Sequence, residues 1–548
     1  MFPMTSPHSV NYPAYRPSVR GLNGVVTSGD ALASQAGIQV MQNGGNAIDA
    51  AIATAAALGV VELPMSGVGG DGFIMIFDAD SQQMFGINAT GPAPSGATRE
   101  FYLERGGIPM KGVLSVSIPG LVDGWIKAHK RFGKLKLSEV FAPAIELCER
   151  GFPVSQKLAQ MLADEHRFFS SDPFTRGIFE PLGRPIVSGE LLLQKDLGTT
   201  LRGIAEDGRK FFYEGAIARQ LEDFSDQYDG LIKFEDLAAF EARWDEPISV
   251  DYCGHRVYEM PPNSSGHVLL QELNLVEQFD IEGMGCLTPE CIHVMVEAKR
   301  LAFADREAFM ADPDWVDVPI AGLLDKQYAG ERAREISLDH VNLEVGPGLP
   351  EQKEDTTCFC VADGSGNAVC VLQSIQSGFG SSLIAGNTGI LLNNRMTYWH
   401  LEEDHVNCLR PGKRVRHTMN PVIVTRDNKP TIVCGTPGAD TQVQTNLQLL
   451  TNAIHFGMTP QEAVEAPRWR SLQNPMESTI PHSCVDCLQM ESRFDSATLD
   501  GLEKRGHRLD KLGDWDGPGN AQFIRIDPDT DAMVGGSDPR RDGYAIAF

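Results

Sequence analysis

The sequence predicts an α+β fold, and two observations support this class. Helical periodicity dominates residues 112–340, whereas short β-rich runs such as TTCFCVAD and NAVCVLQSI alternate with turn residues from Thr356 onward. A long helical part followed by a β-rich part is typical of α+β layers. The first predicted hairpin is also apolar on both faces, as expected for internal strands of stacked sheets. The change in composition falls near residue 355.

The composition is that of a globular protein, with 42% hydrophobic and 22% charged residues in a chain of 548. The net charge of −26 argues against nucleic acid or an anionic membrane as a partner. The N-terminal segment lacks the apolar core of a signal peptide, so we expect a cytoplasmic protein. The run 47–61 is rich in alanine and too short to span a bilayer, which predicts a buried helix.

A glycine-rich stretch, GVGGDG, follows a pair of predicted helices within residues 28–62 that are separated at NGGN. It leads into an apolar strand at FIMIF. A dinucleotide fold requires the opposite order, with a strand before the glycines and a helix after them. We therefore expect no nucleotide site here, and we interpret Asp71 in this stretch as a turn-capping carboxylate.

The 11 cysteines are an odd number in a chain without a secretory signal, which favours reduced thiols. Cys484 and Cys487 form a C-x-x-C motif just after His482. No second ligand pair follows at zinc-finger spacing, so we interpret them as ordinary thiols and predict no metal site.

The segment 289–309 is predicted to be a core helix. Its apolar residues recur at helical spacing, with charged residues on the other face. The apolar positions are Ile292, Met295, Val296, Ala302 and Phe303.

The hairpin CVADGSGNAVC fixes a strand register if Asp363 and Asn367 close its loop. A bulge would shift that register by one residue. The predicted opposing pairs are Cys360 with Cys370, Cys358 with Leu372, and Thr356 with Ser374.

Two explanations fit the hydroxyl groups at the end of this hairpin. Threonine favours strands, and Thr–Ser pairs are common cross-strand neighbours. Alternatively, Thr356 is a nucleophile whose own α-amine, with a pKa of roughly 7.7–8.0, accepts its proton. That mechanism requires cleavage of the peptide bond between Asp355 and Thr356.

Blocks along nearly the entire chain resemble the γ-glutamyltranspeptidases, which are N-terminal nucleophile (Ntn) hydrolases that cleave themselves before a threonine. The resemblance implies an αββα sandwich of two stacked antiparallel sheets between helical layers. It also implies that fragments 1–355 and 356–548 form this one domain together, as a heterodimer. The blocks are NGGNAIDAAIATAAALGVVELPMSGVGGDGF, GVLSVSIPGLVDGW, PPNSSGHVLLQELN, VEAKRLAFADREAFMADPDWV, DTTCFCVADGSGNAVCVLQSIQSGFG, GTPGAD and DPRRDGYA.

The resemblance assigns catalytic roles without a metal or organic cofactor. Thr356 is the nucleophile, and Thr357 is the family's second, supporting threonine. Ser374 stands where the family has a hydroxyl bonded to the nucleophile. Gly438 and Ala439 match the Gly-Gly pair whose N–H groups form the oxyanion hole, and alanine keeps the N–H if its backbone angle does not demand glycine.

The substrate pocket departs from the family pattern. Asn88 replaces an arginine that grips the α-carboxylate of a γ-glutamyl group, and Arg395 and Tyr398 replace the two acids that hold its α-amino group. The lid also looks absent, because only the short segment 399–415 joins two motifs. The remaining substitutions are His417 and Thr418 for Ser-Ser, and Gln376 for asparagine.

These substitutions predict an anion site in place of a cation site, with Arg395 holding a carboxylate. The other interpretation is that Arg395 pairs with a neighbouring acid such as Glu402 or Glu403. The altered pocket is most similar to the oxamate amidohydrolases of purine catabolism, which implies hydrolysis of oxamate to oxalate and ammonia.

Three other functions stay open at this point. The same chemistry serves a γ-glutamyl hydrolase or transpeptidase, and also a glutaryl-cephalosporin-type acylase. An inactive binding protein on the same fold is an alternative of another class. Heterodimers of the two fragments could assemble further into a higher oligomer.

Overall fold

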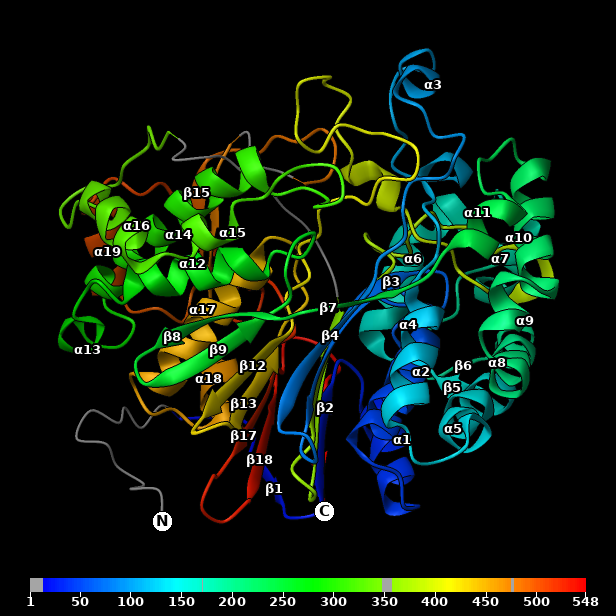
Figure 1. Cartoon of the computed structure of the whole chain (residues 1–548), viewed down its shortest axis with the longest axis horizontal. Helices are drawn as coiled ribbons and strands as arrows, with labels where there is room; N and C mark the ends of the chain where they lie inside the picture. Colours follow the sequence, from blue (N-terminus) through cyan, green and yellow to red (C-terminus); the bar gives the residue numbers. More distant parts are fainter. Residues whose placement is uncertain (1–12, 170, 347–356, 475–477) are drawn as a thin grey trace.

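Two seven-stranded sheets stack face to face at the centre of the molecule. The computed structural model describes residues 13–169, 171–346, 357–474 and 478–548. Every strand pair within both sheets is antiparallel. Figure 1 shows the sheets side by side, with one group of helices against each outer face. The predicted αββα sandwich is confirmed.

The first sheet carries the predicted hairpin at its centre. Its strands, in spatial order, are β19 (Tyr544–Ala547), β2 (Gly24–Ser28), β10 (Thr357–Asp363), β11 (Ala368–Ser374), β3 (Asp71–Asp78), β4 (Gln83–Ala89) and β7 (Arg243–Asp245).

The second sheet also combines strands from distant parts of the chain. Its order is β1 (Val19–Gly21), β18 (Met533–Ser537), β17 (Gln522–Ile526), β13 (Lys429–Gly435), β12 (Val422–Arg426), β9 (His255–Glu259) and β8 (Ile248–Tyr252). Two small sheets lie outside the sandwich: β14 (Trp469–Leu472) with β15 (Cys487–Glu491) and β16 (Leu509–Leu512), and β5 (Phe152–Pro153) with β6 (Leu191–Leu192).

The helices that pack on the first sheet come from the N-terminal part of the chain, and α2 is buried along its whole length. Asn46 and Asp49 form a capping box that starts α2 directly after the NGGN break. This group comprises α1 (Ala31–Gln42), α2 (Ala47–Val61), α4 (Leu121–Phe132), α5 (Leu137–Arg150), α6 (Gln156–Phe169), α7 (Pro173–Phe179), α8 (Lys195–Asp207), α9 (Arg209–Tyr213), α10 (Ala216–Gln227) and α11 (Phe234–Ala239).

The second sheet is covered directly by α12, α17 and α18, and α14 packs on α12, with shorter helices around them (Figure 1). The bounds are α12 (Gly266–Val276), α13 (Ile281–Met284), α14 (Pro289–Phe309), α15 (Ile320–Leu323), α16 (Lys326–Arg332), α17 (Thr441–Ile454), α18 (Pro460–Glu465) and α19 (Ser496–Lys504). The remaining helical turns are α3 (Arg99–Leu103), η1 (Val113–Ser115), η2 (Ala333–Glu335), η3 (Gly386–Thr388) and η4 (Arg395–Tyr398). Among the described helices, none has both the length and the apolar character needed to cross a bilayer.

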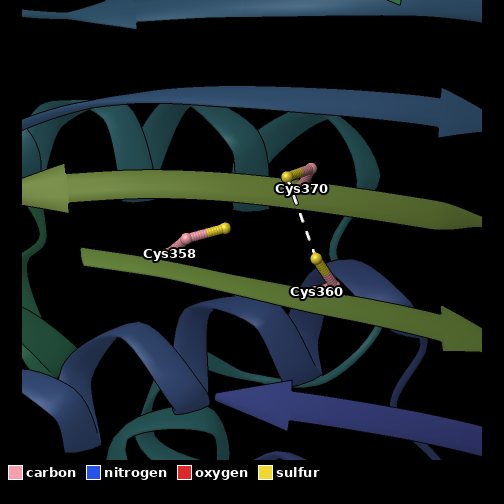
Figure 2. Close-up of side chains that lie close together, drawn as sticks. All are labelled: Cys358, Cys360 and Cys370. Carbon is pink, nitrogen blue, oxygen red and sulfur yellow. Dashed lines mark hydrogen bonds between the residues drawn. The ribbon is translucent and has the colours of Figure 1, made fainter. Parts of the chain in front are cut away.

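The space between the two sheets is filled by apolar and sulfur-bearing side chains. Cys358, Cys360 and Cys370 project from the two neighbouring strands β10 and β11, as Figure 2 shows. The Sγ atoms of Cys360 and Cys370 lie 3.9 Å apart. These cysteines are part of the core that holds the central hairpin against the second sheet.

The hairpin register is confirmed where the structure describes it. Cys360 pairs with Cys370 and Cys358 with Leu372, and Thr357 pairs through its backbone with Gln373. The predicted pair of Thr356 with Ser374 lies outside the described residues. The two helices predicted before FIMIF are also confirmed, as α1 and α2. The glycine-rich loop follows α2 and precedes β3, which is the reverse of the order in a dinucleotide fold.

The helix-rich middle of the chain is confirmed, with one addition and one correction. The helix-rich segment also supplies β7, β8 and β9, which add strands to one edge of each large sheet. In α14 the charged side chains expected on an outer face are buried, because polar partners lie above them. Arg306 donates to Asp440, and Lys299 donates to the backbone oxygen of Ser471.

Candidate active site

The candidate site lies at one end of the central strands of the first sheet. Ser374 is the last residue of β11, and its Cα partner on β3 is Asp71, the first residue of that strand. β10 begins beside them at Thr357. Asp355 and Thr356 lie outside the described residues, so the cleavage site and the nucleophile stay predictions.

Asp71 and Arg395 form a bidentate ion pair in this site. Nε of Arg395 lies 3.2 Å from Oδ2 of Asp71, and Nη2 lies 3.0 Å from Oδ1. Both side chains are fully buried. The alternative in which Arg395 pairs with an acid of the protein is therefore confirmed, but the acid is Asp71 and not Glu402 or Glu403. The interpretation of Asp71 as a turn cap is wrong.

The ion pair also corrects the expected charge of the pocket. We expected a guanidinium without counter-charges, whereas Asp71 balances it. The third guanidinium nitrogen, Nη1, has no hydrogen-bond partner among the described residues. Nη1 therefore has unused donor capacity, and the Tyr398 side chain lies beside the guanidinium.

His417 and Tyr398 complete this cluster. Nε2 of His417 lies 3.4 Å from Oδ2 of Asp71, and Cζ of Arg395 lies 4.5 Å from the centroid of the Tyr398 ring. The ring of Phe73 contacts that of His417 edge to face. The structure therefore brings together Arg395, Tyr398 and His417, as predicted, around an acid that was not predicted to bind them.

Burial controls protonation in the cluster. It lowers the pKa of His417 well below its usual value, and the neighbouring Arg395 charge lowers it further. The imidazole is therefore neutral at pH 7. Burial raises the pKa of Asp71, and the Arg395 guanidinium opposes that shift.

Two asparagines hold the backbone that presents Arg395. Oδ1 of Asn393 accepts from the backbone N–H of Arg395 at 3.0 Å, and its Nδ2 donates to the backbone oxygen of Gly69. Asn394 binds the Ser377 side chain. The LLNN motif thus ties η4 to the loop before β3 and to the turn after β11.

Gln376 lies at the turn that follows Ser374. Its backbone N–H donates to Oγ of Ser374 at 2.8 Å, and its φ of 84° is in the left-handed region. Its Nε2 donates to Thr479 at 2.8 Å, while Oε1 is buried with no partner among the described residues. Thr479 is a neighbour that the sequence did not single out.

Asn88 and Thr418 are engaged by other protein groups. Nδ2 of Asn88 donates to Asp245 and Asn263, and its Oδ1 accepts from Thr90. Oγ1 of Thr418 accepts from Gln442 at 3.3 Å. Because all hydrogen-bonding groups of the Asn88 side chain are used, it is not available to bind a substrate.

Gly438 and Ala439 precede helix α17 in a conformation suited to an oxyanion hole. Their φ angles are 132° and 64°, and their backbone oxygens accept from the first turn of the helix. Neither N–H donates to another described residue. Ala439 thus adopts a left-handed angle that glycine would tolerate better, at a cost of about 1 kcal/mol.

The segment between η4 and His417 packs onto the protein. The ring of His400 stacks between those of His405 and His482, with centroid distances of 3.5 and 3.8 Å. Glu307 of α14 binds His405 at 2.6 Å and Arg416 at 2.6 Å. His482 therefore stacks on this segment, two residues before Cys484 of the C-x-x-C motif.

Two groups of described residues bring three metal-ligating atoms within 4.8 Å of one another: Cys358 with Cys360 and Cys370, and Glu307 with His400 and His405. In the second group the two rings are parallel to within 8°, so their in-plane lone pairs do not converge on one ion. In the first, burial raises the pKa of Cys358 and Cys370, which disfavours thiolates there. Burial acts in the same direction on Cys360, but hydrogen bonds from the other two thiols outweigh it and lower the pKa of Cys360 to about 6, so only one of the three favours a thiolate. Neither group shares a residue with the Asp71 cluster.

Sequence reasoning missed Asp71 as a site residue. The signal available was an acid at the first position of a fully apolar strand, where a buried carboxylate needs a cation. Its partner is 324 residues away, and no local pattern connects the two.

Comparison with known proteins identifies the family and matches the fold. The family model for γ-glutamyltranspeptidase matches residues 33–548. The chain belongs to this family. Hydrolases and acylases of the family cleave amide C–N bonds as Ntn hydrolases, and this chain is an enzyme of that class.

The most similar relatives include hydrolases and an acylase. The chain is 38% identical to the glutathione hydrolase-like YwrD proenzyme of Bacillus subtilis, over 97% of this chain and 99% of that protein. It is 35% identical to the glutathione hydrolase proenzyme of Escherichia coli, over 95% and 91% of the two chains. The crystal structure of a cephalosporin acylase from Bacillus halodurans matches with a TM-score of 0.90 and 36% identity, over 100% and 99%.

Proposed function

We propose that this γ-glutamyltranspeptidase-family enzyme is a self-processing amidohydrolase that acts on small, carboxylate-bearing amides, with oxamate as its substrate. The peptide bond between Asp355 and Thr356 is cleaved first. The mature enzyme is then a heterodimer of the fragments 1–355 and 356–548, with Thr356 at a new N-terminus. It needs no metal or organic cofactor for this chemistry.

The reaction follows from the groups at the site. Oγ of Thr356 attacks the amide carbon while its own α-amine accepts the hydroxyl proton. The N–H groups of Gly438 and Ala439 stabilise the oxyanion. The C–N bond breaks, the leaving nitrogen takes the proton, and water hydrolyses the ester that remains on Thr356.

The choice of substrate rests on the ion pair between Asp71 and Arg395. The Asp71 carboxylate already binds Arg395 through both oxygens, so a γ-glutamyl ammonium group would find no unpaired acid in this cluster. A carboxylate, in contrast, can accept from Nη1 of Arg395. This favours an anionic acyl group over an aminated one.

A second candidate is a γ-glutamyl hydrolase or a cephalosporin-type acylase with the same nucleophile. The full-length match to the acylase structure at a TM-score of 0.90 favours it. An inactive binding protein on this fold is the third possibility, and lack of self-cleavage would support it.

Two measurements on purified protein test the proposal. Mass spectrometry should find two fragments that meet between Asp355 and Thr356, and a single intact chain for Thr356→Ala. Ammonia release should be seen with oxamate and should exceed that with glutamine, the γ-glutamyl primary amide. An intact, active wild-type chain would refute the mechanism, and cleavage of glutamine alone would refute the substrate.

A further inference from the structure

A cavity of about 730 Å³ lies beside the start of β10, outside the Asp71 cluster. It is formed by the turn between β2 and α1 and the start of α1, the end of α2, β5, the start of α6, and two loops near the C-terminus. Its volume is in the range of small-molecule sites, which is about 300–1,000 Å³.

Strand register places this cavity next to the reacting position. Cys360 of β10 pairs with Thr27 of β2. Continuing that antiparallel register brings Asp30, which lines the cavity, level with Thr357. In the sheet order β2, β10, β11, β3, the cavity is on the β2 side of β10, and Asp71 is two strands away on the other side.

Two further contacts connect the cavity wall to the loop of Gly438 and to the turn after Ser374. Gly519 lines the cavity, and its Cα lies 3.3 Å from the point where a Cβ on Gly438 would be. The backbone oxygen of Met65, also in the wall, accepts from the N–H of Ile375 at 3.2 Å. The cavity therefore adjoins both the oxyanion loop and the turn after Ser374.

The apolar part of the lining suits a hydrocarbon or aromatic group. Leu32, Met65, Met161 and Trp515 contribute side chains to it. Leu32 and Trp515 are each 36% exposed, so part of their apolar surface is open to a ligand.

The charged part of the lining disfavours an anion. Four acids face three bases, and one base, Arg540, is bound by Glu491 and Asp538 at distances of 2.6 and 3.0 Å. The acids are Asp30, Glu62, Asp516 and Asp542, and the other bases are Lys157 and Arg541. This surplus of acid favours a neutral or cationic ligand.

We infer that this cavity is the amine-side subsite, which holds the nitrogen substituent of a secondary amide. The inference rests on the proposed function. The acyl group would lie toward Arg395 and the substituent, neutral or cationic and largely apolar, in the cavity. When the C–N bond breaks, the nitrogen takes the proton from the Thr356 α-amine, and a primary amine leaves through the cavity. Oxamate itself, which releases ammonia, would leave the subsite empty, so N-substituted oxamates are the better substrates.

Matched substrates test the inference. kcat/KM is measured for oxamate, N-benzyloxamate and N-(3-carboxybenzyl)oxamate, and in parallel for glutamine and γ-glutamylbenzylamide. We expect the benzyl amide to exceed the primary amide of the same acyl group by about tenfold or more. The carboxybenzyl compound should fall below the benzyl compound.

A cavity-filling variant provides the structural control. Met161→Trp should lower kcat/KM for the benzyl amide much more than that for the primary amide, because the extra ring occupies the subsite and only the benzyl group needs that space. Leu182, which is 72% exposed and outside the cavity lining, is the matched position, and Leu182→Trp should change neither rate.

The outcomes separate the inference from the proposed function. Equal rates for oxamate and its benzyl derivative, or equal losses for both in Met161→Trp, would overturn the subsite alone. The enzyme could instead hydrolyse only glutamine and γ-glutamylbenzylamide, prefer the benzyl amide, and lose that preference in Met161→Trp. That result would overturn the proposed acyl group and support the subsite. Cleaved protein that hydrolyses none of the five amides would overturn both.

Discussion

Arg395 and Asp71 join the η4 turn to the first residue of β3 through a buried bidentate ion pair between residues 324 positions apart. The pair makes the centre of the pocket electrically balanced. It also fixes the guanidinium plane, in which Nη1 is the nitrogen without a hydrogen-bond partner among the described residues. Recognition by this cluster therefore depends on hydrogen-bond geometry more than on net charge.

Asp71→Asn should destabilise the protein strongly. The change leaves the Arg395 guanidinium buried without its counter-charge, and breaking a buried pair in this way costs about 3–5 kcal/mol. Urea unfolding of the single-chain Thr356→Ala background measures the loss. The double variant Asp71→Asn/Arg395→Met should lose less than the sum of its two single changes, and strict additivity would contradict the ion pair.

The sequence was sufficient for the local parts of the fold and insufficient for this pair. The Asp363 and Asn367 turn signals fixed the register of β10 and β11, since a short hairpin leaves few alternatives. Asp71 and Arg395 meet only when the sheet is assembled. Neither residue carries a periodic pattern that points to the other.

The same limit explains the errors in α14. Periodicity found the helix but could not show that Asp440 and Ser471 would cover its charged face. A charged residue is usually exposed, and only the tertiary structure reveals that Arg306 is fully buried against Asp440. The match to family motifs supplied the αββα class that composition alone did not give.

Ala439→Gly should stabilise the protein by about 1 kcal/mol, because it relieves an alanine at a φ of 64°. The variant keeps the backbone N–H, so amide hydrolysis should continue. Gly438→Ala should behave in the opposite way, since its φ is 132° and a Cβ would lie 3.3 Å from Gly519.

Urea midpoints and kcat/KM for both oxyanion-loop variants test this prediction. Ala453→Gly, in the regular helix α17, is the matched control and should lose about 1 kcal/mol. A stability loss of similar size in Ala439→Gly would contradict the left-handed strain.

His267→Gln should make the protein less sensitive to acid. Burial, followed by the Arg306 charge, lowers the pKa of His267 to about 3. Because this folded value is below the ordinary 6.5, the contribution of His267 to stability is present above pH 6.5 and is lost as pH falls toward 3. The wild type should lose about 1.4 kcal/mol per pH unit from this group in that window, and the variant should not. Urea unfolding between pH 4 and pH 7 would show it, and His340→Gln, at an exposed site, should leave the slope unaltered.

Glu272→Gln should make the free energy of unfolding less sensitive to high pH, whereas His267→Gln makes it less sensitive to low pH. Burial raises the pKa of Glu272 to about 8, against the opposing charges of Lys299 and Arg306. A raised pKa favours the protonated form in the folded state, so stability is full below the ordinary 4.5 and declines as pH rises to about 8. The glutamine cannot ionise and should remove a slope of about 1.4 kcal/mol per pH unit. The same change at the exposed Glu331 is the control, and equal slopes for both variants would contradict a buried, neutral Glu272.

Restoring the family's acidic pocket should redirect the enzyme to γ-glutamyl amides. Arg395→Glu alone would place two carboxylates together, since Asp71 lies 3.0 Å from the guanidinium that it replaces. The triple variant Asp71→Gly/Arg395→Glu/Tyr398→Asp avoids this, because it removes the Asp71 carboxylate and returns two acids that can bind an ammonium group. Each charged hydrogen bond regained is worth about 1.5–3 kcal/mol, or about tenfold or more in the ratio of kcat/KM for glutamine to that for oxamate. Asp71→Gly alone should lower oxamate turnover without raising glutamine turnover. If the fully self-cleaved triple variant kept the wild-type ratio, Arg395 and Tyr398 would not be the residues that select the acyl group.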